Sequence, residues 1–140
     1  MDLKDILFQI SFRMIILATI VHEYGHLLSL RLMGYRGVIN SGALNMVTAL
    51  DYNLMSSLEK HLFFIAGGLF QCMIFLIMCI FDKDEENRLV NKMIVIQGFV
   101  YMLFEAFATR IWWETGAVLG ILLSSLFMVL VSRAKYNQTQ

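Results

Sequence analysis

The sequence predicts an all-α polytopic membrane protein that forms a single domain, with about four transmembrane helices and a membrane-associated β-hairpin between the first and second. The first observation is composition: 59% of the 140 residues are hydrophobic, only 16% are charged, and the mean hydropathy is +0.68. A chain this short cannot hide so much apolar surface in its own core, so we expect it to lie in a lipid bilayer. The second observation is charge: 11 basic and 11 acidic residues balance, so no surface for nucleic acid is expected.

Four apolar segments predict the helices, at about 6–33, 62–81, 93–113 and 115–131. Crossing the hydrocarbon takes about 20 helical residues, so the first three segments are long enough and the fourth is short. In residues 34–60, glycine and asparagine interrupt short β-prone runs. This segment is too apolar for a solvated loop, so we expect a hairpin that lies at the membrane face.

The first apolar segment contains the pattern H-E-x-x-H, formed by His22, Glu23 and His26. On a helix, residues four apart lie on one face, so both imidazoles could bind one metal ion, and Glu23 beside them could deprotonate a water molecule. Ionisable residues within a membrane span are costly and usually functional, which favours a metal site. The alternative interpretation is that these polar side chains only join neighbouring helices.

A second segment strengthens this interpretation. Residues 66–71 read A-G-G-L-F-Q and are similar to the A-G-P-L-A-N run of the site-2 protease family, with Gly68 in place of proline and Gln71 in place of asparagine. Together with the H-E-x-x-H pattern, this run makes residues 14–120 resemble that family of intramembrane zinc metalloproteases. The resemblance implies that the hairpin pairs with substrate and that the Gln71 amide supports the transition state.

The third metal ligand is less well defined by the sequence. The family supplies an aspartate from an N-x-x-P-x-x-x-x-D-G stretch of its third core helix, and this chain has no such aspartate, asparagine or proline there. Glu114, which closely precedes Gly116, best matches that position, and we predict it as the ligand. Glu105, deeper in the same apolar segment, is the alternative, and His61 is a third candidate. Nine residues apart on a straight helix, the two glutamates would point in opposite directions.

We therefore predict a zinc-dependent intramembrane endopeptidase with His22, His26 and Glu114 as ligands and Glu23 as general base. Two imidazoles and one carboxylate suit zinc and leave a fourth position open. The expected substrate is a peptide bond within or next to a transmembrane segment, or in a membrane-delivered peptide. The expected partners are this substrate, the bilayer and a possible partner subunit. The absence of the aspartate, asparagine and proline of the family's third-helix stretch favours an alternative, a non-catalytic site-2-protease-like scaffold or partner subunit.

Location and orientation follow from more general arguments. A multi-pass protein of this kind is expected in the plasma membrane. Lysine and arginine are more numerous on the side that holds both termini, which places the N-terminus inside. The family resemblance implies the opposite, with the zinc site nearer the cytosolic face and both termini outside, and we adopt the family orientation as the prediction.

Overall fold

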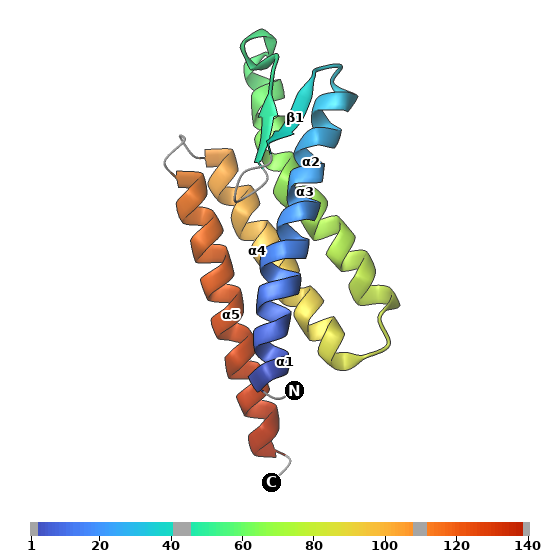
Figure 1. The fold of residues 1–140 in the computed structure, drawn as a ribbon, viewed down its shortest axis with the longest axis vertical. Coiled ribbons are helices and arrows are strands. Elements are labelled where there is room, and N and C mark those ends of the chain that lie inside the picture. The colour runs from blue at the N-terminus through green and yellow to red at the C-terminus, as the bar shows by residue number, and fades with distance from the viewer. Residues whose placement is uncertain (1–2, 41–45, 108–111, 139–140) are drawn as a thin grey trace.

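The computed structural model describes residues 3–40, 46–107 and 112–138, and within these ranges the protein is mostly helical (Figure 1). The first apolar segment forms one continuous rod made of α1 (Leu3–Phe8), the π-helix η1 (Gln9–Leu17) and α2 (Ala18–Leu32). The remaining elements, in chain order, are β1 (Gly37–Asn40), β2 (Met46–Ala49), the short 3-10 helix η2 (Tyr52–Leu54), α3 (Ser57–Phe81), α4 (Glu85–Phe107) and α5 (Trp112–Gln138).

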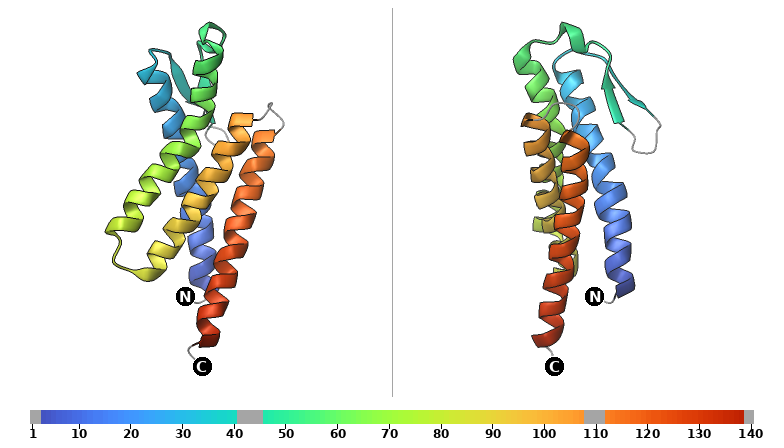
Figure 2. Two further views of the ribbon diagram at one scale, coloured as in Figure 1. Left: turned by 180° about the vertical axis from the view of Figure 1, so that it is seen from behind. Right: turned by 90° about the vertical axis from the view of Figure 1, so that its left-hand side faces the viewer.

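The helices lie side by side, and α4 packs between α3 and α5 (Figures 1 and 2). Both termini and the connection from α3 to α4 lie at one end, and the hairpin lies at the other. Three helical stretches are long and apolar enough to cross a membrane: Lys4–Leu32, Ser57–Phe81 and Glu85–Phe107. In the described part of α5, the apolar stretch is shorter, Val118–Val131. The prediction of a helical protein with a hairpin between its first two long helices is therefore confirmed.

Helix boundaries differ from the predicted ones where capping residues extend a helix beyond its apolar part. The helix α3 begins at Ser57 rather than at residue 62, because Ser56 and Glu59 form a capping box with reciprocal side-chain to backbone bonds. The helix α4 begins at Glu85 rather than at residue 93, and the Asp84 side chain accepts a bond of 2.8 Å from the Glu86 backbone N–H. Most of residues 82–92, which separate the predicted second and third helices, therefore belong to α4.

A π-helical stretch in the first rod was not predicted. The Ala18 N–H donates to the Arg13 carbonyl five residues earlier, as a π-helix requires. The Gln97 amide of α4 donates to the Met14 carbonyl at 3.0 Å, so this buried carbonyl has a partner from another helix. The Arg13 guanidinium donates to the side-chain oxygen of Asn91 at 2.6 Å. Polar side chains of α4 thus compensate for an irregular backbone and for an arginine within a stretch that is apolar enough to cross a membrane.

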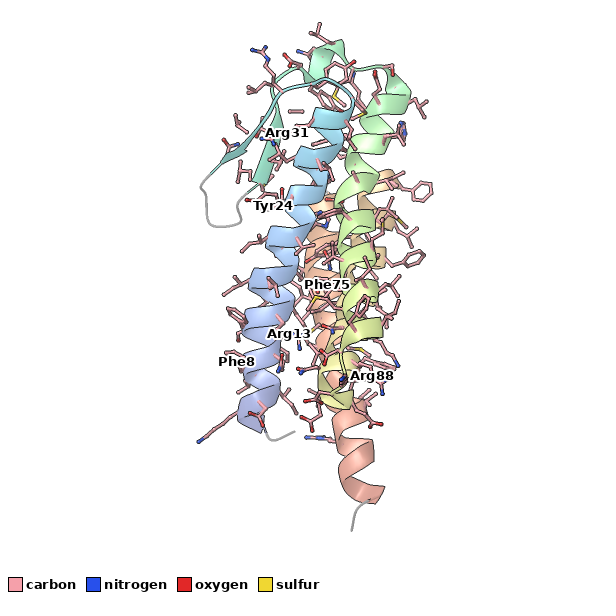
Figure 3. All side chains as sticks on the ribbon, turned by 90° about the vertical axis from the view of Figure 1, so that its right-hand side faces the viewer. Phe8, Arg13, Tyr24, Arg31, Phe75 and Arg88 are labelled. Carbon is pink, nitrogen blue, oxygen red and sulfur yellow. The ribbon has the colours of Figure 1, made fainter. Side chains whose placement is uncertain are left out.

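Two clusters of buried side chains hold the elements together. The larger one lies towards the end that holds the termini and joins the first rod to α3 and α4; its buried members are Ile6, Met14, Ala18, Phe75, Val90, Met93 and Ile94. In Figure 3, Phe75 points between the helices whereas Phe8 points outwards, and Phe8 is 59% exposed. Large apolar side chains exposed along the outer faces of the helices are compatible with contact with lipid.

The smaller cluster fixes the hairpin on the ends of α2 and α3. Leu30, Met55 and Phe63 are its buried members, and Val47 of β2 packs against them. The two strands are antiparallel, with Val47 opposite Ile39, and they fold back alongside α2 (Figure 2). This folding back brings β2 next to the helix that carries the H-E-x-x-H pattern.

An ion pair closes the base of the hairpin. The Arg36 guanidinium donates to both carboxylate oxygens of Asp51, at 2.8 and 3.0 Å. The same carboxylate accepts a bond from the Arg36 backbone N–H, and together these bonds lower the pKa of Asp51 to about 2. The two chain segments that leave the strands are thereby held together.

Candidate metal centre

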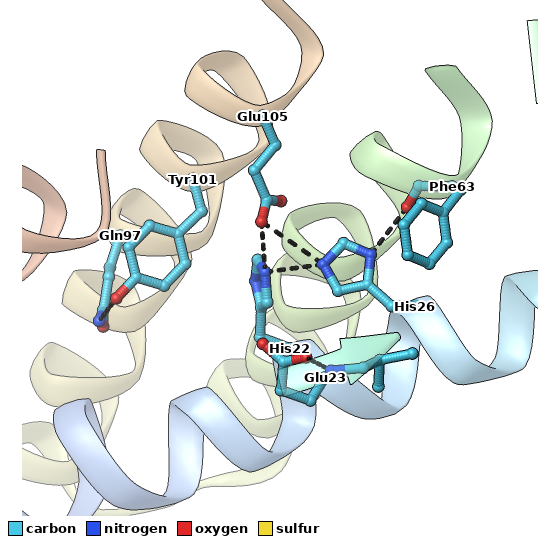
Figure 4. A network of polar contacts seen from close by, with 8 residues as sticks. His22, Glu23, His26, Phe63, Gln97, Tyr101 and Glu105 are labelled. Atoms are coloured by element: carbon cyan, nitrogen blue, oxygen red, sulfur yellow. Dashed lines mark hydrogen bonds and ion pairs between the residues drawn. The ribbon is translucent and has the colours of Figure 1, made fainter. Parts of the chain in front are cut away.

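The two histidines of the H-E-x-x-H pattern lie one turn apart on α2 and point towards α3 and α4 (Figure 4). His22 and His26 are 4% and 5% exposed, and their Nε2 atoms are 3.1 Å apart. The Nδ1 atom of His26 lies 2.7 Å from the carbonyl oxygen of Phe63. Because a carbonyl oxygen only accepts, Nδ1 must donate, and the Nε2 atom of neutral His26 keeps a lone pair that faces His22. A metal ligand needs this tautomer.

Glu105 of α4 adds a third possible ligand atom. Its Oε1 atom lies 3.1 Å from His22 Nε2 and 3.4 Å from His26 Nε2, and its side chain is 12% exposed. Three atoms bound to one tetrahedral zinc ion at about 2.0–2.1 Å would lie about 3.3–3.4 Å from one another. The three observed separations differ from this value by no more than about 0.3 Å, so one ion could bind all three atoms after small shifts.

The surroundings of the three atoms also fit a cation. Among the described residues, the Oε2 atom of Glu105 is buried without a hydrogen-bond partner and is thus a further acceptor at the site. On the side of α3, the site is closed by Gly67, where an added Cβ would collide with the Nε2 atoms of both histidines. The absence of a side chain at this position therefore lets both imidazole nitrogens reach the centre of the helix bundle.

Glu23 lies at the edge of the same site. Its Oε2 atom accepts a hydrogen bond of 2.8 Å from the backbone N–H of Val47 in β2. One possible ligand atom from each of His22, Glu23 and His26 lies within 4.8 Å of the other two, so this group could bind a metal ion. A carboxylate at this separation can also contact a water molecule that lies next to the ion, which is the position of a general base.

A pocket of about 90 Å³ gives access to these groups from the side of the hairpin. Glu23, His26 and Glu105 form its polar wall, and its apolar wall comes from the strand β2 and from the start of α3, through Met46, Val47, Phe63 and Phe64. The candidate metal centre is therefore open to a pocket that lies between β2 and the start of α3.

The predicted ligand Glu114 is placed differently from the sequence expectation. It lies in the first turn of α5, whereas we expected it at the end of the third long helix, which in the structure ends at Phe107. The Glu114 side chain lies outside the described part of the structure, so its role stays a prediction. The carboxylate that the structure brings to the two histidines is that of Glu105, the alternative that the sequence offered.

Two other candidate residues have partners of their own. The buried Gln71 amide donates to the Ile94 carbonyl at 3.0 Å, so it joins α3 to α4, and its part in catalysis stays a prediction. The exposed His61 uses its Nδ1 atom on the Ser57 carbonyl at 2.7 Å, one turn back on its own helix. His61 is not among the side chains that meet at His22 and His26.

Several contributors to the site were not foreseen. The Phe63 carbonyl and the Val47 N–H are backbone groups, and the side-chain pattern of a sequence carries no signal for them. The ring of Tyr101 contacts the edge of His22 at a centroid distance of 5.0 Å, and its hydroxyl accepts a bond from Gln97. The sequence places both residues on one helical stripe with Glu105, one and two turns before it, but it gives no signal for the contact with His22.

No protein-family model matches this chain, and neither a curated protein nor a solved structure matches it. Its class therefore follows from the fold and the site alone. The chain is a mostly helical protein with three stretches able to span a membrane, and its group of His22, Glu23 and His26 could bind a metal ion.

Proposed function

We propose that the protein is a zinc-dependent intramembrane endopeptidase, which hydrolyses a peptide bond within or next to a transmembrane segment or in a membrane-delivered peptide. The observation that carries the proposal is the convergence of His22 Nε2, His26 Nε2 and Glu105 Oε1 within 3.4 Å of one another, with a second carboxylate, Glu23, beside them. This combination supplies three ligands and a base and leaves a fourth coordination position for the reaction.

The ligand set favours zinc. Two imidazoles and one carboxylate in a roughly tetrahedral arrangement are typical of catalytic zinc sites. A bound zinc ion supplies Lewis acidity, which makes water acidic near neutral pH and polarises a carbonyl group. The Phe63 carbonyl fixes the tautomer of His26, and Gly67 keeps the space in front of both Nε2 atoms free. We therefore assign the third ligand to Glu105 in preference to Glu114.

Glu23 has the role of general base in this proposal. It takes a proton from the attacking water molecule as the new bond to the scissile carbonyl carbon forms, and it later delivers this proton to the leaving amine nitrogen. Its position at the wall of the pocket, and not at the centre of the ligand triangle, suits a group that must contact water and substrate in turn.

The hairpin gives the substrate an extended conformation. A transmembrane helix offers no accessible carbonyl, because its backbone groups bond to one another. The strand β2 lines the pocket, and a peptide that pairs with it would lie with one peptide bond next to Glu23 and Glu105. The apolar side chains of Phe63 and Phe64 favour an apolar residue next to the bond that is cleaved.

A non-catalytic membrane subunit is the second candidate. The observation in its favour is that His22 and Glu105 already bond to each other at 3.1 Å and so join α2 directly to α4. Such a bond could serve only to hold the helices together. A subunit of this kind would contain no stoichiometric zinc, and loss of the Glu23 carboxylate would leave its function unchanged.

Zinc content and cleavage measured on the same preparations test the proposal. The purified protein should contain one zinc ion per chain, and the Glu105→Gln variant should lose it, because a neutral amide replaces an anionic ligand. Glu114→Gln is the matched control and should keep the ion. Glu23→Gln should keep the ion and the fold but no longer cleave labelled single-span peptides in micelles, followed by mass spectrometry of the fragments.

Three results would contradict parts of the proposal. A wild-type protein without zinc would favour the non-catalytic subunit. Normal turnover by Glu23→Gln would exclude this residue as the base. Loss of zinc from Glu114→Gln but not from Glu105→Gln would return the ligand role to Glu114.

A further inference from the structure

The hydrogen bond between Val47 and Glu23 uses a backbone group that a third strand would need. In the hairpin, the Leu50 N–H donates to the Arg36 carbonyl at 3.0 Å, and the register pairs Val38 with Thr48. Bonded and non-bonded pairs alternate along an antiparallel ladder, so the N–H of Val47 points away from β1, at the outer edge of β2. The Glu23 carboxylate therefore caps part of a strand edge that is otherwise ready to pair.

The same edge faces the candidate metal centre. Val47 and Met46 line the pocket together with Glu23 and Glu105, so a peptide lying in this pocket extends along β2. The amide of Val47 has a single proton, and a peptide carbonyl that takes it must displace the Glu23 carboxylate. Hydrogen bonds to a charged acceptor are stronger than those to a neutral carbonyl, so the carboxylate is an effective competitor for this donor.

We propose that the Val47 N–H acts as a latch, which holds the Glu23 carboxylate while the site is empty and passes to a substrate carbonyl when a peptide pairs with β2. The latch rests on the proposed peptidase function and adds to it a regulation by the substrate. Glu23 becomes free to move towards the scissile bond only when a strand has docked in register. Peptides that enter the pocket without pairing leave the carboxylate bound to Val47.

The latch makes a thermodynamic prediction, because two groups that compete for one donor weaken each other's binding. Removal of the Glu23 carboxylate should tighten the binding of an extended peptide, by about tenfold if a charged hydrogen bond has to be broken. This tightening should depend on the Val47 N–H. The effect is opposite in sign to that expected if Glu23 only contacts and holds the peptide.

Fluorescence anisotropy on metal-free protein in micelles measures this linkage, with a labelled, uncharged peptide of alternating valine and threonine as the probe. Glu23→Ala should bind the probe about tenfold more tightly than wild type. In a Val47→Pro background, the same change should have no effect, because proline lacks the N–H. Proline is tolerated where the N–H points away from a ladder. Ala49→Pro, the matched control on the same edge, should leave the effect of Glu23→Ala intact.

A second measurement needs no variant. In protein labelled with ¹⁵N-valine, the amide resonance of Val47 should move when the probe is added, because its acceptor changes from a carboxylate to a carbonyl. The amide of Val38 points towards β2 within the ladder and should stay in place. A Val47 resonance that stays fixed while the probe binds, a Glu23→Ala effect that persists in Val47→Pro, or no binding by any variant would refute the latch.

These outcomes are separable from the test of the proposed function. Both measurements are made without metal, so they do not depend on zinc binding or turnover. Zinc and cleavage without the linkage would overturn the latch and leave the peptidase in place. The linkage in a protein without zinc or cleavage would show the competition for the Val47 N–H but overturn the peptidase, and with it the role of the latch in cleavage.

Discussion

Replacement of Gly67 by alanine should separate metal binding from folding. In the structure, a Cβ added at Gly67 would lie 2.6 Å from His22 Nε2 and in collision with His26 Nε2. Contacts of this kind below 3.0 Å are essentially never seen, so the His22 nitrogen must retreat by about 0.4 Å or more. Zinc–ligand distances tolerate only about ±0.2 Å, so two of the three proposed ligands would leave their positions.

The expected loss in zinc affinity is at least the 10–100-fold that is typical when a supporting residue of a metal site is changed. The fold should persist, because the added methyl group meets the ends of two side chains, and because alanine favours a helix over glycine by up to about 1 kcal/mol. We therefore expect the melting temperature of the metal-free variant to stay near that of the metal-free wild type. Competition with a fluorescent chelator measures the affinity, and circular dichroism measures the melting.

The neighbouring glycine provides the control. A Cβ at Gly68 would lie 2.6 Å from the backbone nitrogen of Met102, so Gly68→Ala must push α3 away from α4 and should lower the melting temperature. The two variants have the same chemistry and adjacent positions but opposite expected effects on stability. Wild-type zinc affinity in Gly67→Ala would refute the placement of both Nε2 atoms at the metal.

Three further predictions concern the fold around the site. The pKa of Asp51 is lowered to about 2 by Arg36, so the stabilisation from this ion pair is present above the unfolded value of about 3.9 and is lost as pH falls towards 2. Protection of the hairpin amides from exchange should therefore fall over this pH range, and Asp51→Asn should remove this pH dependence. Ser56→Ala should destabilise the start of α3 by about 1 kcal/mol, seen as faster local amide exchange. Gln97→Leu should lower stability to denaturant by about 1–2 kcal/mol, because the buried Met14 carbonyl loses its partner; no change would show that the bond contributes nothing.

The sequence was sufficient to predict a mostly helical protein with a hairpin, and the group of His22, Glu23 and His26 that could bind a metal ion. Apolar run lengths predicted the first three long helices, because lipid-exposed helices need an unbroken apolar surface of a fixed length. The spacing of His22 and His26 predicted their common direction, since this depends only on helix geometry. The hairpin was predicted in 34–60 from glycine and asparagine, and its strands lie at Gly37–Asn40 and Met46–Ala49.

Helix ends were less predictable because polar groups determine them. The S-x-x-E pattern at Ser56 and Glu59 is a known start signal, but the apolar run begins several residues later and dominates a hydropathy argument. Likewise, Glu85 and Glu86 belong to α4 although their charges suggest a loop. The π-helix near Arg13 had no counterpart in the sequence pattern, since its compensating partners come from α4, more than 70 residues away.

The choice between Glu105 and Glu114 shows why the site could not be completed from the sequence. Glu105 lies within the apolar run 93–113 and Glu114 directly follows it. The match to the D-G position of the family favours Glu114, whereas burial favours Glu105. The choice depends on how far α4 slides along α2, which is a property of packing between helices. The structure places Glu105 Oε1 at 3.1 Å from His22, and no local pattern along α4 determines that register.

Glycines explain why this register is so closely defined. A Cβ at Gly25 of α2 would lie 2.6 Å from the Ala66 carbonyl, and a Cβ at Gly68 of α3 would lie against the Gly98 carbonyl of α4. At these positions α2 and α4 each lie close to the backbone of α3 within one turn of Gly67, where the imidazoles fill the space of the missing side chain. The contacts that align the helices and the space that admits the ligand nitrogens thus belong to the same short stretch of α3. A change that moves this stretch must alter helix packing and ligand geometry together, whereas one that only fills the space at Gly67 alters the ligands alone.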